Sequence, residues 1–243
     1  MELQSPWTTQ IKKERDSQKL DKNLDTDICI IGGGISGVVT AYNILTKTDH
    51  STTLLEAYKI AHGATGHNAG QLVAELERSV VSLVEDFGFE KTIKAIQNIE
   101  SSWILIEQII EDLNLNVNYS TFLGYNLYST KEQIENKLND LIILQEGDVN
   151  IRKMLIAREY FDSLQLDFKF NSLIDIISQD DILSLSETKN PDYIAALPLK
   201  KGCLNSALFT EKVVHSLLQK YPNRLYVYEE SPVKEIIISD ENI

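Results

Sequence analysis

Hydrophobic and polar positions follow two different periods in the first quarter of the chain. Four consecutive apolar residues, Ile28 to Ile31, predict a strand that is buried on both faces. Apolar residues at helical spacing predict a helix over 38–45, and the stretch TTLLEA at 52–57 predicts a second strand. A strand, a helix and a strand within about thirty residues are typical of a βαβ crossover unit.

The later chain also mixes helical and strand patterns. Further helices are predicted over 99–113, 131–147 and 206–221, and further strands over 121–130, 224–230 and 233–239. The pattern between 151 and 200 is mixed. We therefore expect an α/β fold.

Composition and charge narrow the class of protein. The chain has 243 residues, 43% of them hydrophobic, and a net charge of -13, so we expect no nucleic-acid partner. No apolar stretch reaches the roughly 20 residues of a transmembrane helix, and residues 1–24 are polar rather than a secretory signal. We expect a cytoplasmic protein whose residues 1–24 form an extension that lies over the surface or stays mobile.

The two cysteines suggest neither a metal site nor a disulfide. Cys29 and Cys203 are far apart in sequence and have no C-x-x-C partner, and the histidines show no metal-ligand spacing. Cys29 lies in the apolar run of the first strand, so we expect it to be a small buried residue.

The segment GGGISG, directly after the first strand, carries the first chemical signal. Gly32, Gly34 and Gly37 satisfy G-x-G-x-x-G, where the glycines permit a tight turn, approach of a pyrophosphate and close helix packing. The N-terminus of the following helix attracts an anion. Glu56 ends the second strand, where a carboxylate accepts hydrogen bonds from ribose and favours FAD or NAD over NADP. The simpler alternative is a glycine turn between packed elements.

The segment GATGHNAG at 63–70 distinguishes FAD from NAD. NAD domains usually continue from the second strand into a helix, whereas this chain continues into a glycine-rich loop. Glycine-rich backbone lies flat against a cofactor where side chains would clash. FAD is long enough to need such a second surface.

Three stretches together resemble a known enzyme family: DICIIGGGISGVVTAYNILTK, TLLEA and GATGHNAGQL. They are similar to the FAD-dependent amine and amino-acid oxidoreductases typified by D-amino-acid oxidase, glycine oxidase and sarcosine oxidase. The greatest similarity is to the branch that contains gamma-glutamylputrescine oxidase, which also has a polar N-terminal extension with a motif like SPW. The resemblance is specific over 26–72 and weaker but collinear afterwards.

The resemblance implies a Rossmann-like FAD-binding domain with a partial α+β substrate-binding domain. It assigns 25–115 and 202–243 to an incomplete FAD-binding domain and 116–201 to the partial substrate-binding domain. The residues that it implies for FAD binding are Gly32, Gly34, Ile35, Ser36, Gly37, Glu56, Ala57, Ala64, Thr65, Gly66, His67, Asn68, Ala69, Gly70, Gln71 and Val233.

His67 departs from the pattern of that branch, which would have Arg at this position. Dimethylglycine and sarcosine dehydrogenases place a His in a similar arrangement and attach FAD covalently through it. Two roles therefore stay open for His67: a covalent link to FAD, or an imidazole that faces solvent or bonds the backbone in place of Arg.

The family continues well beyond the equivalent of Ile243, so the chain resembles the N-terminal half of such an enzyme. A truncated chain, a disrupted gene and a two-chain enzyme would share this pattern. Unpaired strand edges would also favour a homo-oligomer.

The resemblance implies oxidation of the C–N bond of an amine or amino acid by hydride transfer to flavin. No catalytic residue can be assigned, because Tyr119, Tyr125 and Tyr128 lie in a predicted strand where aromatic residues usually serve packing. Two alternatives stay open: a non-catalytic nucleotide-binding or assembly module, and an NAD-linked dehydrogenase.

Overall fold

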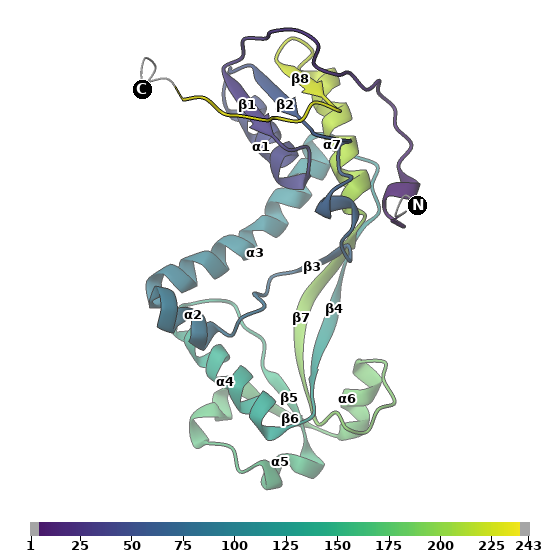
Figure 1. The fold of residues 1–243 in the computed structure, drawn as a ribbon. Coiled ribbons are helices and arrows are strands. Elements are labelled where there is room, and N and C mark those ends of the chain that lie inside the picture. The colour runs from purple at the N-terminus through teal and green to yellow at the C-terminus, as the bar shows by residue number, and fades with distance from the viewer. Residues whose placement is uncertain (1–4, 239–243) are drawn as a thin grey trace. The chain divides into compact units, whose positions relative to one another are not determined.

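A computed structural model describes residues 5–238, which divide into two compact units (Figure 1). Unit 1 contains the described residues up to Gln71, residues 107–119 and the described residues from Cys203 onward. Unit 2 contains residues 72–106 and 120–202. None of the helices among residues 5–238 is both long and apolar enough to cross a membrane.

Unit 1 is built on a parallel sheet of three strands in the order β1-β2-β8. The strands are β1 (Ile28–Ile31), β2 (Thr52–Leu55) and β8 (Leu225–Tyr228). Ile28 pairs with Thr52, and Thr52 pairs with Leu225, so the three strands start in register. The crossover from β1 to β2 is α1 (Ile35–Lys47), as the sequence predicts.

Two helices of unit 1 contribute a large part of its core. The buried face of α1 consists of Val38, Ala41, Tyr42 and Leu45. It packs against α7 (Ser206–Lys220), whose Phe209 and Val213 are fully buried. The Asn205 side chain caps α7 by accepting a hydrogen bond from the Leu208 amide.

The prediction of a strand at 28–31 is confirmed, but burial of that strand on both faces is wrong. Of its four residues only Ile30 is buried, while Ile31 is 53% exposed and Cys29 is also exposed. The reason is that β1 is an edge strand of the described sheet and contacts α1, toward which Ile30 packs. A hydrophobic run specifies a strand, but not what covers each of its faces.

The predicted strand at 233–239 is also wrong over the described residues 233–238, which form no strand; Ser239 lies outside them. Ile236, Ile237 and Ile238 are between 69% and 82% exposed. β-branched residues favour extended backbone, but a strand forms only when a neighbouring strand supplies hydrogen-bond partners.

Unit 2 combines a mixed sheet with helices that cover it. The sheet has five strands in the order β3-β7-β5-β6, with β4 also paired to β7. Its strands are β3 (Gln71–Val73), β4 (Tyr119–Tyr128), β5 (Met154–Ala157), β6 (Ile174–Ile177) and β7 (Ala195–Leu204). The first residue of β3, the first of β4 and the last two of β7 fall in unit 1. β5 runs parallel to β6 and antiparallel to β7.

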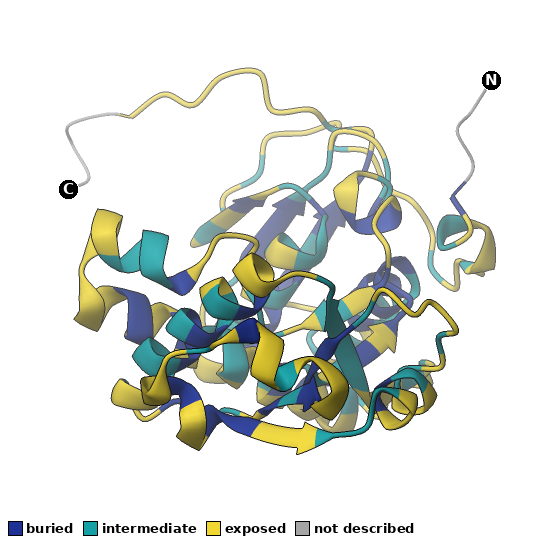
Figure 2. Cartoon of the chain, turned by 90° about the horizontal axis from the view of Figure 1, so that it is seen from below, coloured by how far each residue is buried: buried dark blue, intermediate teal, exposed yellow. Residues whose placement is uncertain are grey.

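The helices of unit 2 begin and end at recognisable signals. They are α2 (Val80–Phe87), α3 (Phe89–Asp112, which ends in unit 1), α4 (Lys131–Glu146), α5 (Arg158–Leu164) and α6 (Gln179–Leu185). α4 begins with a capping box in which Thr130 and Gln133 bond each other's backbone. Its buried residues Ile134 and Leu138 join Ile156 of β5 in one hydrophobic core. Figure 2 colours the described chain by burial, with buried residues in dark blue.

Candidate functional site

The turn between β1 and α1, which we call the first glycine segment (Gly32–Gly37), is shaped by close backbone contacts. Gly32 has φ +103°, a left-handed conformation that favours glycine, and its amide donates to Leu55 O at 2.8 Å. A Cβ on Gly37 would lie 2.0 Å from Gly32 O. The tight turn and the close helix packing expected of these two glycines therefore have a steric basis.

Gly33 is a residue that sequence reasoning missed. Its amide donates to Glu56 Oε2 at 2.7 Å, and a Cβ at this position would lie 2.2 Å from Ile60 Cδ1. The sequence does mark this position, because Gly33 is a third consecutive glycine that the motif G-x-G-x-x-G does not require. Gly33 joins the first glycine segment to the end of β2.

The N-terminus of α1 offers backbone donors rather than a side-chain cap. Gly34 occupies the N-cap position, and the Ile35 amide donates to Thr65 Oγ1 at 2.9 Å. Within residues 5–238 no acceptor bonds the amides of Ser36 and Gly37. Unpaired amides and the helix dipole together favour an anion such as a pyrophosphate.

Glu56 follows β2 directly, at the carboxyl end of the parallel sheet. Besides the Gly33 amide, its carboxylate accepts from the Tyr58 amide at 2.8 Å. Its backbone pairs with β8 and the chain after it, since Glu56 N donates to Tyr228 O and Ser231 N donates to Glu56 O. Ala57, the next residue, is exposed. The carboxylate is thus fixed beside the first glycine segment.

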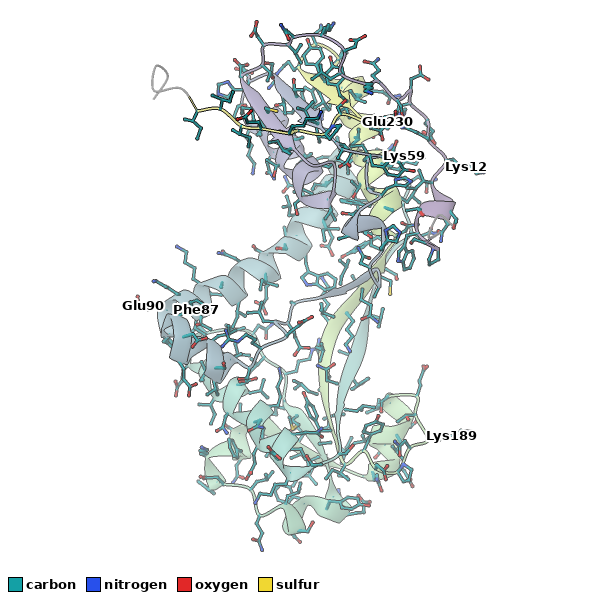
Figure 3. All side chains as sticks on the ribbon, in the orientation of Figure 1. Lys12, Lys59, Phe87, Glu90, Lys189 and Glu230 are labelled. Atoms are coloured by element: carbon teal, nitrogen blue, oxygen red, sulfur yellow. The ribbon has the colours of Figure 1, made fainter. Side chains whose placement is uncertain are left out.

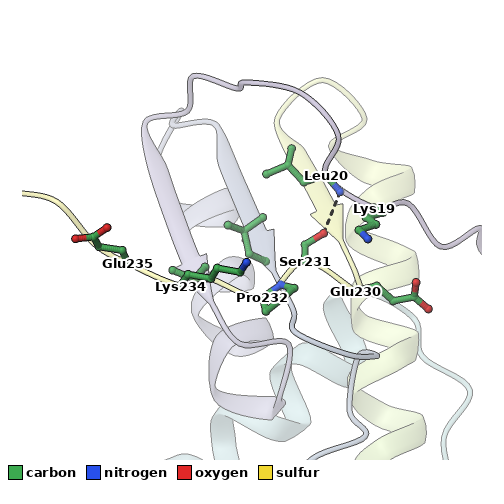
Figure 4. A pocket seen from close by; sticks show the side chains of 9 residues that line it. Lys19, Leu20, Glu230, Ser231, Pro232, Lys234 and Glu235 are labelled. Carbon is green, nitrogen blue, oxygen red and sulfur yellow. Dashed lines mark hydrogen bonds between the residues drawn. The ribbon is translucent and has the colours of Figure 1, made fainter.

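A pocket of about 530 Å³ lies beside this strand end (Figure 4). Leu55 lines it together with the segment after β8, including Val233 and Ser231. Lys19 and Leu20 of the N-terminal extension complete it, and the Leu20 amide donates to Ser231 Oγ at 2.9 Å. Sequence reasoning named Val233 but missed Leu20 and Ser231, which no motif marks.

The second glycine segment (Gly63–Gly70) contains the short helix η2 (Ala64–Gly66). Ser206 Oγ donates to Thr65 O at 2.6 Å, and Asn68 Oδ1 accepts from the Gly70 amide at 2.8 Å. A Cβ on Gly66 would lie 2.4 Å from Ala61 O, while Gly70 has φ +65°. Two of its glycines are therefore sterically required.

One side of this segment is open and the other is packed. Thr65, Gly66 and Gly70 are buried, whereas the exposed members of the predicted set are Ala64, His67, Asn68, Ala69 and Gln71. His67 Nδ1 lies 2.9 Å from Gly63 O. Because a carbonyl only accepts, Nδ1 is the donor in this contact.

The tyrosines of β4 lie in packed or hydrogen-bonded positions. Tyr128 packs against the core cluster that contains Ile156, and Tyr125 packs against Ala157 and Ile182. The Tyr119 hydroxyl donates to Glu107 Oε1 at 2.7 Å. These contacts support packing as the role of Tyr125 and Tyr128, and they assign no catalytic group.

Comparison with known proteins decides the family. Residues 27–238 match the family described as DAO, FAD dependent oxidoreductase. The chain belongs to this family. The resemblance and the α/β, Rossmann-like fold class drawn from the sequence are confirmed.

Three proteins illustrate the relationship. Gamma-glutamylputrescine oxidoreductase of Escherichia coli (strain K12) is 32% identical over 71 residues, which are 29% of this chain and 16% of that protein. Glycine oxidase from Bacillus cereus ATCC 14579 matches at a TM-score of 0.57 and 18% identity, covering 89% of this chain and 49% of its own. L-Amino acid deaminase from Proteus myxofaciens matches at a TM-score of 0.62 and 16% identity, and the match covers 93% of this chain and 43% of that protein. The chain thus spans less than half the length of these proteins.

Proposed function

We propose that unit 1 binds FAD and that the protein oxidises the C–N bond of an amine or amino acid. The observation that carries this proposal is the glycine cradle, in which backbone leaves no room for a Cβ on Gly37 and α1 presents unpaired amides. These features fit a dinucleotide pyrophosphate. When bound, FAD supplies the ring system that accepts hydride from the α-carbon of the substrate.

The chain's own residues bind and orient the cofactor. The amides of Ser36 and Gly37 donate to the pyrophosphate, and the Glu56 carboxylate accepts from ribose hydroxyls. The exposed side of the second glycine segment, from Ala64 to Gln71, lies along the ribityl chain and flavin. Val233 offers its backbone to the adenine at the pocket beside Leu55. The acidic residue at position 56 supports FAD over a 2′-phosphorylated nucleotide.

For His67 we propose the role of a backbone-bonding imidazole rather than a covalent link. The contact of Nδ1 with Gly63 O supports this role, because it holds the turn at the end of η2. The covalent alternative has a structural basis as well, since His67 is exposed. The experiment below distinguishes the two.

The proposed substrate class is supported by the names of the relatives, which describe action on a glutamylated amine, glycine and L-amino acids. We propose that residues 25–115 and 202–243 form the cofactor domain and that 116–201 belong to the substrate domain. Since the chain spans less than half of these relatives, we propose that a further polypeptide segment or a second chain contributes substrate contacts.

An absorbance spectrum of the purified chain, incubated with FAD, desalted and then precipitated with acid, tests the proposal. We expect flavin bands that co-elute with the protein and flavin that is released into the supernatant. Flavin that stays in the pellet would favour the covalent link, and His67→Ala would then move it to the supernatant. Absence of flavin from both fractions would contradict FAD binding.

A further inference from the structure

The N-terminal segment Ser5–Leu20, which we call the strap, contacts unit 1 at three places. It contains the short helix η1 (Thr8–Gln10), and the exposed residue Lys12, which Figure 3 labels, lies on it. The strap belongs to unit 1 together with both glycine segments. Each contact lies at or next to a part of the proposed FAD site.

The first contact joins the strap to the second glycine segment. Trp7 Nε1 donates a hydrogen bond to Asn68 O, and its ring lies so close to Gly70 that a Cβ there would be 2.8 Å from Cζ2. The methyl group of Thr8 faces Gly66, where a Cβ would lie 2.7 Å away. Asn205 Nδ2 donates to Trp7 O at 3.2 Å and so fixes the strap to the start of α7.

The second contact is a buried charge cluster. Arg15 Nε lies 2.9 Å from Glu211 Oε1, and Arg15 Nη1 lies 3.2 Å from Glu229 Oε2. These side chains are 7% exposed or less. Burial opposes the charge of Glu229, but hydrogen bonds from Lys13, Ser17, the Ile60 amide and Arg15 outweigh it and lower its pKa to about 2. Removing one partner from such a cluster is strongly destabilising.

The cluster also reaches the chain that enters the second glycine segment. Glu229 Oε1 accepts from the Ile60 amide at 2.8 Å. The third contact continues from there: Gln18 O accepts from the Glu229 amide at 2.8 Å, and Leu20 bonds Ser231 at the pocket. The strap therefore touches the proposed site at the second glycine segment and again at the Val233 pocket.

We propose that the strap fixes the backbone of the second glycine segment in the conformation that receives FAD, with Trp7 as the positioning residue. This inference rests on the proposed FAD site. Trp7 covers Gly70 with its ring and restrains the Asn68 carbonyl through its hydrogen bond. A segment that is ordered before binding spares the ligand the cost of ordering it, so the strap raises FAD affinity without touching FAD.

The test compares FAD affinity of the full chain and three variants by fluorescence titration. Trp7→Ala removes the ring and the donor, and Trp7→Phe removes the donor and part of the indole surface but keeps an aromatic ring. Trp103→Phe makes the same exchange at the buried Trp103 of unit 2 and serves as the matched control. We expect affinity to fall about tenfold for Trp7→Ala, to be partly restored by Trp7→Phe and to be unchanged in Trp103→Phe.

Urea unfolding without FAD identifies any variant that fails to fold, and Trp7→Phe then carries the test. Equal affinity for FAD in wild type, Trp7→Phe and Trp7→Ala would overturn the positioning role while leaving the proposed function intact. A wild-type chain that bound no FAD would instead refute the proposed function, and the positioning role with it.

Discussion

The two glycine segments of unit 1 keep their shapes by different means. The first is closed by the elements that flank it, since Gly37 abuts Gly32 O and Gly33 bonds Glu56 at the end of the adjacent strand. The second has local hydrogen bonds as well, such as that from the Gly70 amide to Asn68, but it is also held by residues distant in sequence: Trp7 from the strap, and Ser206 at the start of α7. The first segment is encoded by its neighbouring elements, and the second depends in addition on contacts between distant parts of the sequence.

This difference explains why the two segments do not respond alike to sequence change. In the first, a Cβ on Gly37 would collide with the backbone carbonyl of Gly32, which lies in the turn between β1 and α1. In the second, part of the constraint comes from an indole ring and a hydrogen bond that a substitution elsewhere can remove. We therefore expect the largest loss of stability at Gly37, from a clash within the first segment, and a smaller loss at Gly70 in the second segment.

The largest effect is expected for Gly37→Ala. The new Cβ would lie 2.0 Å from Gly32 O, so α1 or the turn has to shift, at a cost of about 3 kcal/mol or more in unfolding free energy. FAD should be lost on desalting. Urea denaturation and the flavin absorbance of the desalted protein measure both effects.

Gly34→Ala is the matched control for that change. Its Cβ would meet only the Thr65 hydroxyl, at 3.1 Å, and a side-chain oxygen can move. If Gly34→Ala destabilised unit 1 as much as Gly37→Ala, backbone closure would not be what shapes the first segment.

A smaller effect is expected for Gly70→Ala in the second segment. The left-handed φ of +65° and contacts at 2.8 Å with Leu204 O and the Trp7 ring should lower unfolding free energy by about 2 kcal/mol. Gly63→Ala is the control, because no atom lies within 4 Å of its Cβ, and its unfolding free energy should change by less than about 0.5 kcal/mol. Combining Gly70→Ala with Trp7→Ala should cost less than the sum of the two, because removal of the Trp7 ring relieves its clash with the new Cβ. If the two losses of unfolding free energy were strictly additive, Trp7 and Gly70 would not be coupled, and the strap would not restrain the second segment at this position.

Sequence patterns predicted those parts of the site whose structure is determined by residues close together in the chain. The run before Gly32, the glycine spacing and Glu56 at the end of β2 sufficed to predict the βαβ unit and a dinucleotide site, because neighbouring residues determine each feature. Family resemblance added FAD and Val233. The binding roles of these residues stay predictions.

What the sequence did not predict depends on partners that are distant along the chain. Arg15, Glu211 and Glu229 form one cluster, yet no spacing rule links them. The same limit explains the errors: Cys29 and Ile31 looked buried, and 233–238 looked like a strand, because apolar runs do not state which strand or helix lies beside them.

The smallest effect tests the one hydrogen bond that connects the two segments. Thr65, in η2 of the second segment, accepts from the Ile35 amide at the start of α1 in the first. Thr65→Val keeps the shape but removes the acceptor, and the buried position prevents water from replacing it freely, so unfolding free energy should fall by about 1 kcal/mol. Thr65→Ser keeps the acceptor and should preserve FAD affinity, whereas Thr65→Val should lower it a fewfold, because both segments have to face the same cofactor. If both variants bound FAD equally well, the two segments would act independently and the bond between them would be only structural.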